Sequence, residues 1–220
     1  MGFLTRLGEG IASAARVVGN AVKEVTDTVK EFVGDAWNAI TFRLDVGYDH
    51  PEIIDMQMEQ QSCEIVKEVL GGEPFDQFAV LLPAERKMAI ENVIAETSDM
   101  MGVELEGIAF ADLGDVSGFY SEKGKVIALN EEPLCQEVMT EEEAMEVIDT
   151  VFHELRHAYQ FRAARYPSRY KRDKLTAAIW RLNWKNYAKF GQNAKLYFDQ
   201  PLEVDARNFA ISVINNLRRS

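Results

Sequence analysis

The chain has 220 residues and a formal net charge of −12, and 47% of its residues are hydrophobic and 27% charged. This composition is typical of a folded globular domain and excludes a disordered chain or a small disulfide-stabilised scaffold. No apolar run approaches the about 20 residues that a membrane-spanning helix needs, so we expect no transmembrane segment. Arg16 and Gly19 interrupt the apolar stretch near the N-terminus, and we therefore expect a protein that is cytoplasmic or exported without a cleaved signal peptide.

Acidic and basic residues are unevenly distributed along the chain. Residues 1–154 contain 10 Lys and Arg against 32 Asp and Glu, whereas residues 155–220 contain 14 against 4. A basic segment of this kind can mark a nucleic-acid-binding surface, but phosphate repels a chain of such negative net charge at long range. We therefore expect basic C-terminal helices to pack beside acidic N-terminal ones, and we expect no nucleic-acid partner.

Residues 1–45 are predicted to form an amphipathic helical arm. Apolar residues recur at intervals of three and four from Phe3 to Ala36, which is the spacing of one helix face. Such an arm most often packs against its own domain or another chain, but residues 2–40 could also contact a partner or a membrane surface, or serve in delivery. Residues 46–220 are expected to form the second domain.

The remaining sequence predicts helices, then a small group of strands, then helices again, which indicates an α+β fold. Helices are expected from Pro51 to about Leu70, from near Pro83 to before Gly102, from near Thr140, from Lys174 to Phe190 and from Pro201. Strands are expected at Leu105–Phe110, Gly118–Tyr120 and Lys125–Asn130, the last two as a hairpin around residues 121–124. A disulfide between Cys63 and Cys135 is left open.

Residues 153–157 read His-Glu-Leu-Arg-His, inside the helix that begins near Thr140. Residues four apart lie on one face of a helix, so His153 and His157 can direct their imidazoles to one point. Zinc accepts such nitrogens at about 2.0–2.1 Å, and Glu154 can take a proton from a metal-activated water. The motif therefore predicts a zinc site with Glu154 as the general base. The alternative is a pair of helix histidines that only pack and form hydrogen bonds.

A catalytic zinc site needs a third protein ligand and one open position. No His or Cys follows His157, and Glu203 is the only Glu after it. We expect Glu203 to be the third ligand, because it lies at the N-terminal end of the final helix, where a carboxylate is favoured. Asp205 is the alternative, either as the ligand or as an acceptor for the ring N–H of a ligand.

The run from His153 to Gln160, followed by Pro201-x-Glu203-x-Asp205, resembles the zincin metallopeptidases of the gluzincin kind. The resemblance is to compact bacterial HExxH domains, some of which are toxin or effector modules, and it covers residues 100–215. It implies a mostly helical zincin-like domain over residues 46–220, with a small antiparallel sheet beside the active-site helix. It also implies that the strand Val126–Asn130 binds the substrate backbone as an added strand.

Three related families fit the sequence less well. The metzincin extension needs Gly and His where this chain has Gln160 and Ala163. Thermolysin-like enzymes have an Asn-Glu-x-x-x-Asp pattern that residues 200–205 do not match. Cys135 does not stand in the Glu-Gly-Cys motif of peptide deformylases.

The motif and the resemblance together predict a zinc metallopeptidase that hydrolyses peptide bonds in a protein or peptide substrate. An oxyanion-stabilising donor is also expected, for which Tyr197 is a candidate together with Tyr187, Tyr159 and Arg207. The aromatic residues of the helix from Lys174 are expected in the core. Two alternatives remain: a non-catalytic zinc-binding structural or interaction protein, and an exported effector whose N-terminal helix is a delivery or membrane-contact segment.

Overall fold

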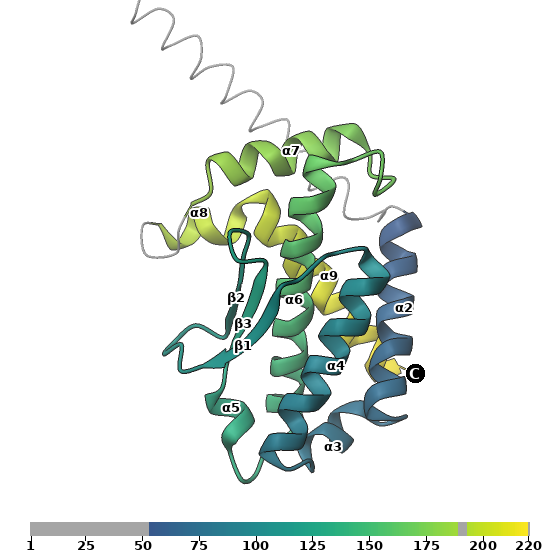
Figure 1. Ribbon diagram of the computed structural model, residues 1–220, viewed down its shortest axis with the longest axis vertical. Coiled ribbons are helices and arrows are strands. Elements are labelled where there is room, and N and C mark those ends of the chain that lie inside the picture. Colours follow the sequence, from purple (N-terminus) through teal and green to yellow (C-terminus); the bar gives the residue numbers. More distant parts are fainter. Residues whose placement is uncertain (1–52, 189–192, 220) are drawn as a thin grey trace, which may run out of the picture. The chain divides into compact units, whose positions relative to one another are not determined.

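The computed structural model describes residues 53–188 and 193–219, so the predicted arm over residues 1–45 lies outside the described residues. The described residues confirm the predicted α+β fold, which is mostly helical and has one small sheet (Figure 1). None of their helices is long and apolar enough to cross a membrane. In chain order the elements are α2 (Ile53–Leu70), α3 (Pro74–Ala79), α4 (Pro83–Met101), β1 (Gly107–Ala111), β2 (Gly118–Ser121), β3 (Val126–Asn130), α5 (Glu132–Cys135), α6 (Glu141–Arg165), α7 (Lys174–Lys185), α8 (Ala194–Asp199) and α9 (Pro201–Arg219).

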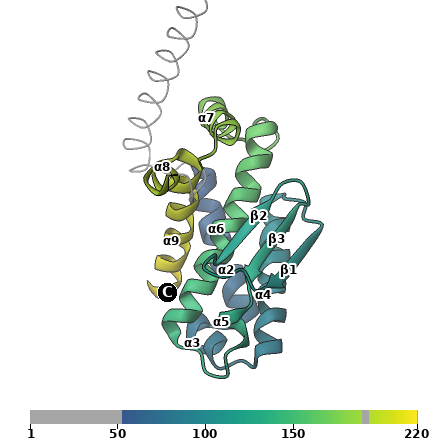
Figure 2. The same ribbon diagram turned by 90° about the vertical axis from the view of Figure 1, so that its left-hand side faces the viewer.

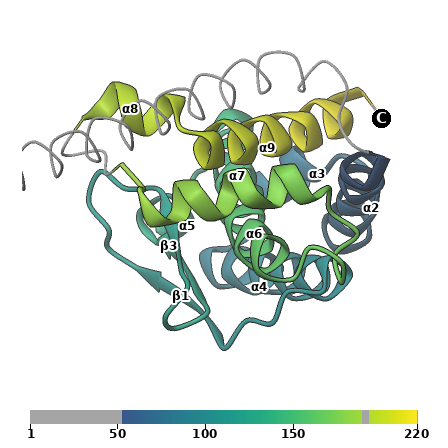
Figure 3. The same ribbon diagram turned by 90° about the horizontal axis from the view of Figure 1, so that it is seen from above.

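The long helix α6 lies at the centre of these elements, between the sheet and α2, with α9 and α4 on its two other sides (Figure 3). It begins as predicted, because Thr140 accepts a hydrogen bond from the Glu143 N–H while the Glu143 carboxylate accepts one from the Thr140 N–H. Of its 25 residues, 14 are buried, which is more than the single stripe that a surface helix buries. The helix is covered on several sides, by α9, α7, α3, α4 and β2.

The three strands form a mixed sheet in the order β1-β3-β2. β2 and β3 pair in the antiparallel sense, as the predicted hairpin requires, but β1 and β3 pair in the parallel sense. The expectation of an antiparallel sheet is corrected at this pair. The loop after β1 reverses the chain and the hairpin reverses it again, so β3 runs in the direction of β1 and lies beside it. Figure 2 shows this sheet and α9 on opposite flanks of α6.

The central position of β3 corrects the prediction that Val126–Asn130 binds the substrate. This strand is paired along both edges, with Gly107–Ala111 on one side and Gly118–Ser121 on the other, so a peptide cannot add to it. Its apolar sequence identified it as a strand, but three buried residues in a row are typical of a strand in the middle of a sheet. The edge strand in contact with α6 is β2.

Helix α7 ends at Lys185, five residues before the predicted end at Phe190. The next residue, Asn186, donates from its side-chain amide to the Leu182 carbonyl at 3.0 Å and so satisfies an oxygen at the end of the helix. Tyr187 therefore follows the helix instead of continuing it. This early end allows Tyr187 to approach α9.

Ion pairs join the basic C-terminal part of the domain to acidic residues that come earlier in the chain. Arg156 and Arg172 both pair with Asp55 of α2, and Arg162 pairs with Glu104. These pairs agree with the expectation that basic helices pack beside acidic ones. No disulfide adds to these links among the described residues, where the buried Cys63 and the exposed Cys135 are both free.

Candidate metal centre

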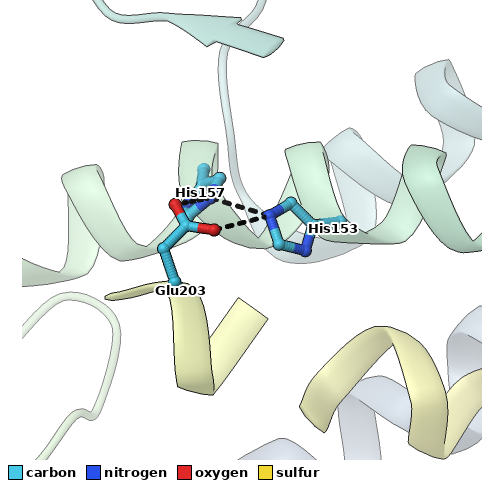
Figure 4. Close-up of side chains that lie close together, drawn as sticks. All are labelled: His153, His157 and Glu203. Carbon is cyan, nitrogen blue, oxygen red and sulfur yellow. Dashed lines mark hydrogen bonds and ion pairs between the residues drawn. The ribbon is translucent and has the colours of Figure 1, made fainter. Parts of the chain in front are cut away.

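His153, His157 and Glu203 form a close group of three side chains, which we call the triad (Figure 4). The Nε2 atoms of the two histidines lie 3.1 Å apart. Glu203 Oε2 lies 3.3 Å from His153 Nε2, and Glu203 Oε1 lies 3.1 Å from His157 Nε2. The structure therefore brings the predicted third carboxylate to the two histidines of the motif, from a different helix.

The start of α9 is fixed by contacts that direct Glu203 toward α6. Leu202 is fully buried, and its N–H donates to the Asn183 side chain of α7 at 2.9 Å. Asn183 in turn donates to the side-chain oxygen of Gln200 at 3.0 Å. Because Pro201 opens the helix between these two contacts, Glu203 lies in the first turn, where unpaired backbone N–H groups favour a carboxylate.

The three side chains lie close enough together to hold a small metal ion. Four ligands at about 2.0–2.1 Å around a tetrahedral zinc lie about 3.3 Å from one another. The two Nε2 atoms lie 3.1 Å apart, and each lies near this distance from one Glu203 oxygen, His157 from Oε1 at 3.1 Å and His153 from Oε2 at 3.3 Å. The side chains of His153, His157 and Glu203 are 16%, 7% and 2% exposed, so His153 is the most open to solvent. The triad can hold a metal ion through two nitrogens and one carboxylate and leave one position open.

The three side chains are electrostatically coupled. Burial alone would raise the pKa of the Glu203 carboxyl, but hydrogen bonds from His153 and His157 hold it well below its usual range. Burial likewise opposes protonation of His157, yet its hydrogen bond to Glu203 and the nearby Glu154 carboxylate raise its pKa to about 9. At neutral pH the triad therefore contains an ionised Glu203 carboxylate and a protonated His157. A divalent cation that binds there would displace this proton.

Glu154 lies beside the triad, on the side of the sheet. Its side chain is buried, and burial raises its pKa, whereas the charges of His157 and His153 and the backbone N–H of Tyr120 lower it. Tyr120 belongs to the edge strand β2, so the carboxylate lies between the triad and this strand. A buried carboxylate of raised pKa beside a cation site has the position of a general base.

Two of the four candidate oxyanion donors lie at the triad. The Tyr187 hydroxyl donates to Glu203 Oε1. Tyr197 packs edge-on against the Tyr187 ring, and its hydroxyl is in hydrogen-bonding contact with Tyr187 and Glu203. The side chains of Tyr159 and Arg207 form their hydrogen bonds with other partners.

The aromatic residues of α7 divide between the core and the triad. Trp180 is buried, as expected. The ring of Trp184 instead lies 6.1 Å from that of His157 and stacks on Tyr187 with 5.6 Å between the ring centres. The expectation of a core position is therefore corrected for Trp184 and Tyr187. The early end of α7 brings this pair to the triad.

Gln160 contacts the His157 ring, and sequence reasoning had assigned it no role. Its Oε1 lies 2.9 Å from His157 Nδ1, and its Nε2 donates to Asp205 at 2.6 Å. Asp205, the alternative ligand, therefore contacts Gln160, which in turn contacts the ring of His157. The available signal was that Gln160 lies three residues after His157, one helical turn away and within reach of its ring.

Comparison of the chain with protein-family models, with curated proteins and with solved structures gives no match. The fold and the triad define an α+β protein with a candidate metal centre of two histidines and one glutamate.

Proposed function

We propose that this protein is a zinc-dependent metallopeptidase of the zincin kind. The observation that carries the proposal is the convergence of His153, His157 and Glu203, with the Glu154 carboxylate beside them. Two imidazoles and a carboxylate that leave one position open are typical of catalytic zinc, whereas magnesium and calcium prefer oxygen ligands. When bound, zinc would supply a Lewis acid that lowers the pKa of water to about 7.

Glu154 would act first as general base and then as general acid. Its buried carboxylate, whose pKa is raised by burial, accepts the proton of the attacking water. It returns that proton to the amine nitrogen as the C–N bond of the peptide breaks. The Tyr120 N–H holds the carboxylate on the side of β2, so the base faces the strand along which a substrate would lie.

Tyr197 would stabilise the oxyanion that develops on the substrate carbonyl. Burial raises its pKa to about 12, so the hydroxyl remains protonated at neutral pH and can donate a hydrogen bond. Both tyrosine hydroxyls contact Glu203; we assign the support of that ligand to Tyr187, which donates directly to Glu203 Oε1. In this proposal Tyr187 supports the ligand Glu203, and Tyr197 stabilises the oxyanion.

A peptide substrate would pair with the outer edge of β2, the edge that is not paired with β3. The Asn130 N–H donates to the Ser117 carbonyl at 2.8 Å, next to the β2–β3 pairing. Backbone groups alternate in direction along an antiparallel pair, so Gly118 and Tyr120 direct theirs away from β3. The contact between the Tyr120 N–H and Glu154 agrees with this direction. A strand added at this edge would bring its scissile carbonyl to the triad.

Cleavage of a mixed peptide library by the zinc-loaded full chain, followed by mass spectrometry, would test the proposal. Glu154→Gln should retain zinc but lose cleavage by a factor of about 100 or more, because the amide cannot accept the proton. Glu146→Gln is the matched control, since Glu146 lies on the same helix and is exposed. It should cleave as the parent does.

The same assay distinguishes the alternatives. Equal cleavage by the parent and by Glu154→Gln would contradict the proposed base and point to a contaminating peptidase. A parent that binds zinc stoichiometrically and cleaves no peptide in the library would instead favour a structural zinc site.

A further inference from the structure

A buried chain of polar contacts leads from α2 to the ring of His157. It begins at Asp55, in the first turn of α2, whose Oδ1 lies 2.7 Å from Arg156 Nη1. Arg156 donates to both carboxylate oxygens of Asp205 on α9, at 2.7 and 3.0 Å. Asp205 accepts from Gln160 at 2.6 Å, and Gln160 Oε1 lies 2.9 Å from His157 Nδ1. We call Asp55, Arg156, Asp205 and Gln160 the polar relay.

Gln160 determines which nitrogen of His157 faces the triad. The Gln160 Nε2 donates to the Leu202 carbonyl at 2.9 Å and to Asp205, and these two acceptors fix the orientation of the amide. The Gln160 Oε1 can only accept, so His157 Nδ1 carries the hydrogen of their contact. In the neutral ring, Nε2 is then unprotonated and directs its lone pair toward the other ligands.

Gln160 also connects the two helices that supply the ligands. On α9, its partners Leu202 and Asp205 lie on either side of Glu203 in the sequence. On α6, it lies three residues after His157. One buried side chain therefore fixes the start of α9 relative to α6 at the point where Glu203 must face the histidines.

Arg156 extends this connection to α2. Asp55 is shared between Arg156 and Arg172, which donates to it at 2.6 and 2.7 Å. Together with Asp205, the buried group contains two carboxylates and two guanidinium groups and has no net charge. Loss of one member leaves an uncompensated buried charge, so the group is held as a unit. Three aromatic rings lie within 5.4 Å of the Arg156 guanidinium, those of Tyr159, Trp180 and Phe209.

We propose that the polar relay positions the His157 ring and Glu203, so that Gln160 and Asp55 set how tightly the triad holds zinc. The inference rests on the proposed zinc binding. Asp55 lies 98 positions before His153 in the sequence and has no contact with the triad among the described residues. It would act through Arg156, Asp205 and Gln160 as a positioning residue.

Zinc dissociation constants of the full chain, measured by competition with a chromophoric chelator, would test the relay. Gln160→Met keeps the length of the side chain and removes its hydrogen bonds, and we expect an affinity about 10- to 100-fold weaker. Asp55→Asn keeps the shape and removes the charge, and we expect an affinity about 3- to 30-fold weaker. Thermal unfolding by circular dichroism would establish that each variant is folded at the temperature of the measurement.

Glu59→Gln is the matched control for Asp55→Asn. Glu59 lies one turn further along α2 and accepts a hydrogen bond from Ser212 of α9 at 2.7 Å. It therefore links the same two helices as the relay does, but without a contact to Gln160. Its zinc affinity should stay within about twofold of the parent.

Nitrogen NMR of the histidine rings gives a second readout that does not depend on zinc. At a pH where the ring is neutral, the metal-free parent should show His157 with its hydrogen on Nδ1, the nitrogen that faces Gln160 Oε1. Gln160→Met should lose this preference, and Glu59→Gln should keep it. A simple loss of stability would not change the tautomer in this selective way.

The outcomes separate the relay from the proposed function. Unchanged zinc affinity and an unchanged tautomer in Gln160→Met would overturn the relay. Equal affinities for Asp55→Asn and Glu59→Gln would overturn the role of Asp55. If the parent binds no zinc, the proposed function is wrong. If Gln160→Met nevertheless loses the Nδ1–H form of His157, the relay still orients the His157 ring.

Discussion

The Tyr187 hydroxyl donates a hydrogen bond to the Glu203 carboxylate, so a residue just beyond α7 supports a ligand that α9 supplies. The Tyr187 ring stacks on Trp184 with an angle of 17° between the planes, and Trp184 lies edge-on to His157. One aromatic pair thus contacts two members of the triad. Both contacts restrict the rotation of the ligands, and neither follows from the metal motif.

Tyr187→Phe should weaken zinc binding about tenfold, because Glu203 loses the hydrogen bond that orients its carboxylate while the stacking on Trp184 persists. Chelator competition would measure the change. The control is Tyr170→Phe, which removes a hydrogen bond to the Gly102 carbonyl away from the triad and should bind zinc as the parent does. Parent-like affinity in Tyr187→Phe would mean that the hydroxyl does not orient the ligand.

Tyr197→Phe should lower activity even when the site is filled with zinc. If its hydroxyl donates to the developing oxyanion, kcat for peptide cleavage falls about 100-fold or more at saturating zinc, where a weaker hold on Glu203 has no effect on occupancy. Steady-state kinetics at saturating zinc would measure this. A variant with the kcat of the parent would remove Tyr197 from the mechanism.

Elemental analysis of purified protein would distinguish Glu203 from Asp205 as the third ligand. Glu203→Ala and His157→Ala should each lose stoichiometric zinc, because a direct ligand is removed. Asp205→Asn should retain zinc when zinc is in excess, because the ligand atoms that converge belong to His153, His157 and Glu203, and Asp205 contacts the partner of His157, Gln160. Zinc retained by Glu203→Ala would show that another group completes the site.

The parts of the fold that the sequence predicted correctly depend on local chemistry. The start of α6 follows from Thr140 and Glu143, which are three residues apart and cap the helix by themselves. The approach of His153 and His157 follows from one helical turn. Glu203 was found by elimination, since the last part of the chain offered no other Glu, His or Cys as a ligand.

The parts that sequence reasoning missed depend on how distant elements pack. The direction of β1 relative to β3 is set by two reversals of the chain, and it cannot be predicted from the hydrophobic pattern of either strand. The contacts of Gln160 and Asp55 depend on α9, which packs against both α6 and α2, and on the ion pair between Asp55 and Arg156. The only indication of Gln160 in the sequence was its position one helical turn after His157.

Gly118 allows β2 to lie close to α6. A Cβ atom at this position would lie 2.9 Å from Thr150 Cγ2, 3.0 Å from Leu129 Cδ2 and 3.0 Å from the Ala128 carbonyl oxygen. The Ala128 oxygen is backbone of the paired strand and cannot rotate away, so an alanine would displace β2. Gly118→Ala should therefore lower the free energy of unfolding by about 1–3 kcal/mol.

The same substitution should also reduce peptide cleavage, because it moves the Tyr120 N–H relative to Glu154. Urea unfolding and the library assay would measure the two effects. Gly72→Ala is the control, since a Cβ there would meet nothing within 4 Å. If Gly118→Ala and Gly72→Ala unfold at the same urea concentration, the close approach of β2 to α6 imposes no steric requirement for glycine.

Asp55 should make the stability of the domain depend on pH in the acid range. Burial alone would raise its pKa, but the charge of Arg156 and the hydrogen bond from Arg172 lower it from 3.8 to about 2. A carboxyl whose pKa is lowered by folding contributes stability that is fully present above its unfolded pKa and is lost as the pH falls through the folded value. The shift corresponds to about 2 kcal/mol, which should disappear between about pH 4 and pH 2.

Urea unfolding at a series of pH values would measure this contribution. Between about pH 4 and pH 2 the free energy of unfolding should fall more steeply in the parent than in Asp55→Asn, because the variant has no carboxylate to protonate there. Asp76→Asn, at an exposed position of α3, should keep the profile of the parent. Equal slopes in the parent and in Asp55→Asn would mean that the buried arginines do not hold Asp55 ionised, and would contradict the first contact of the polar relay.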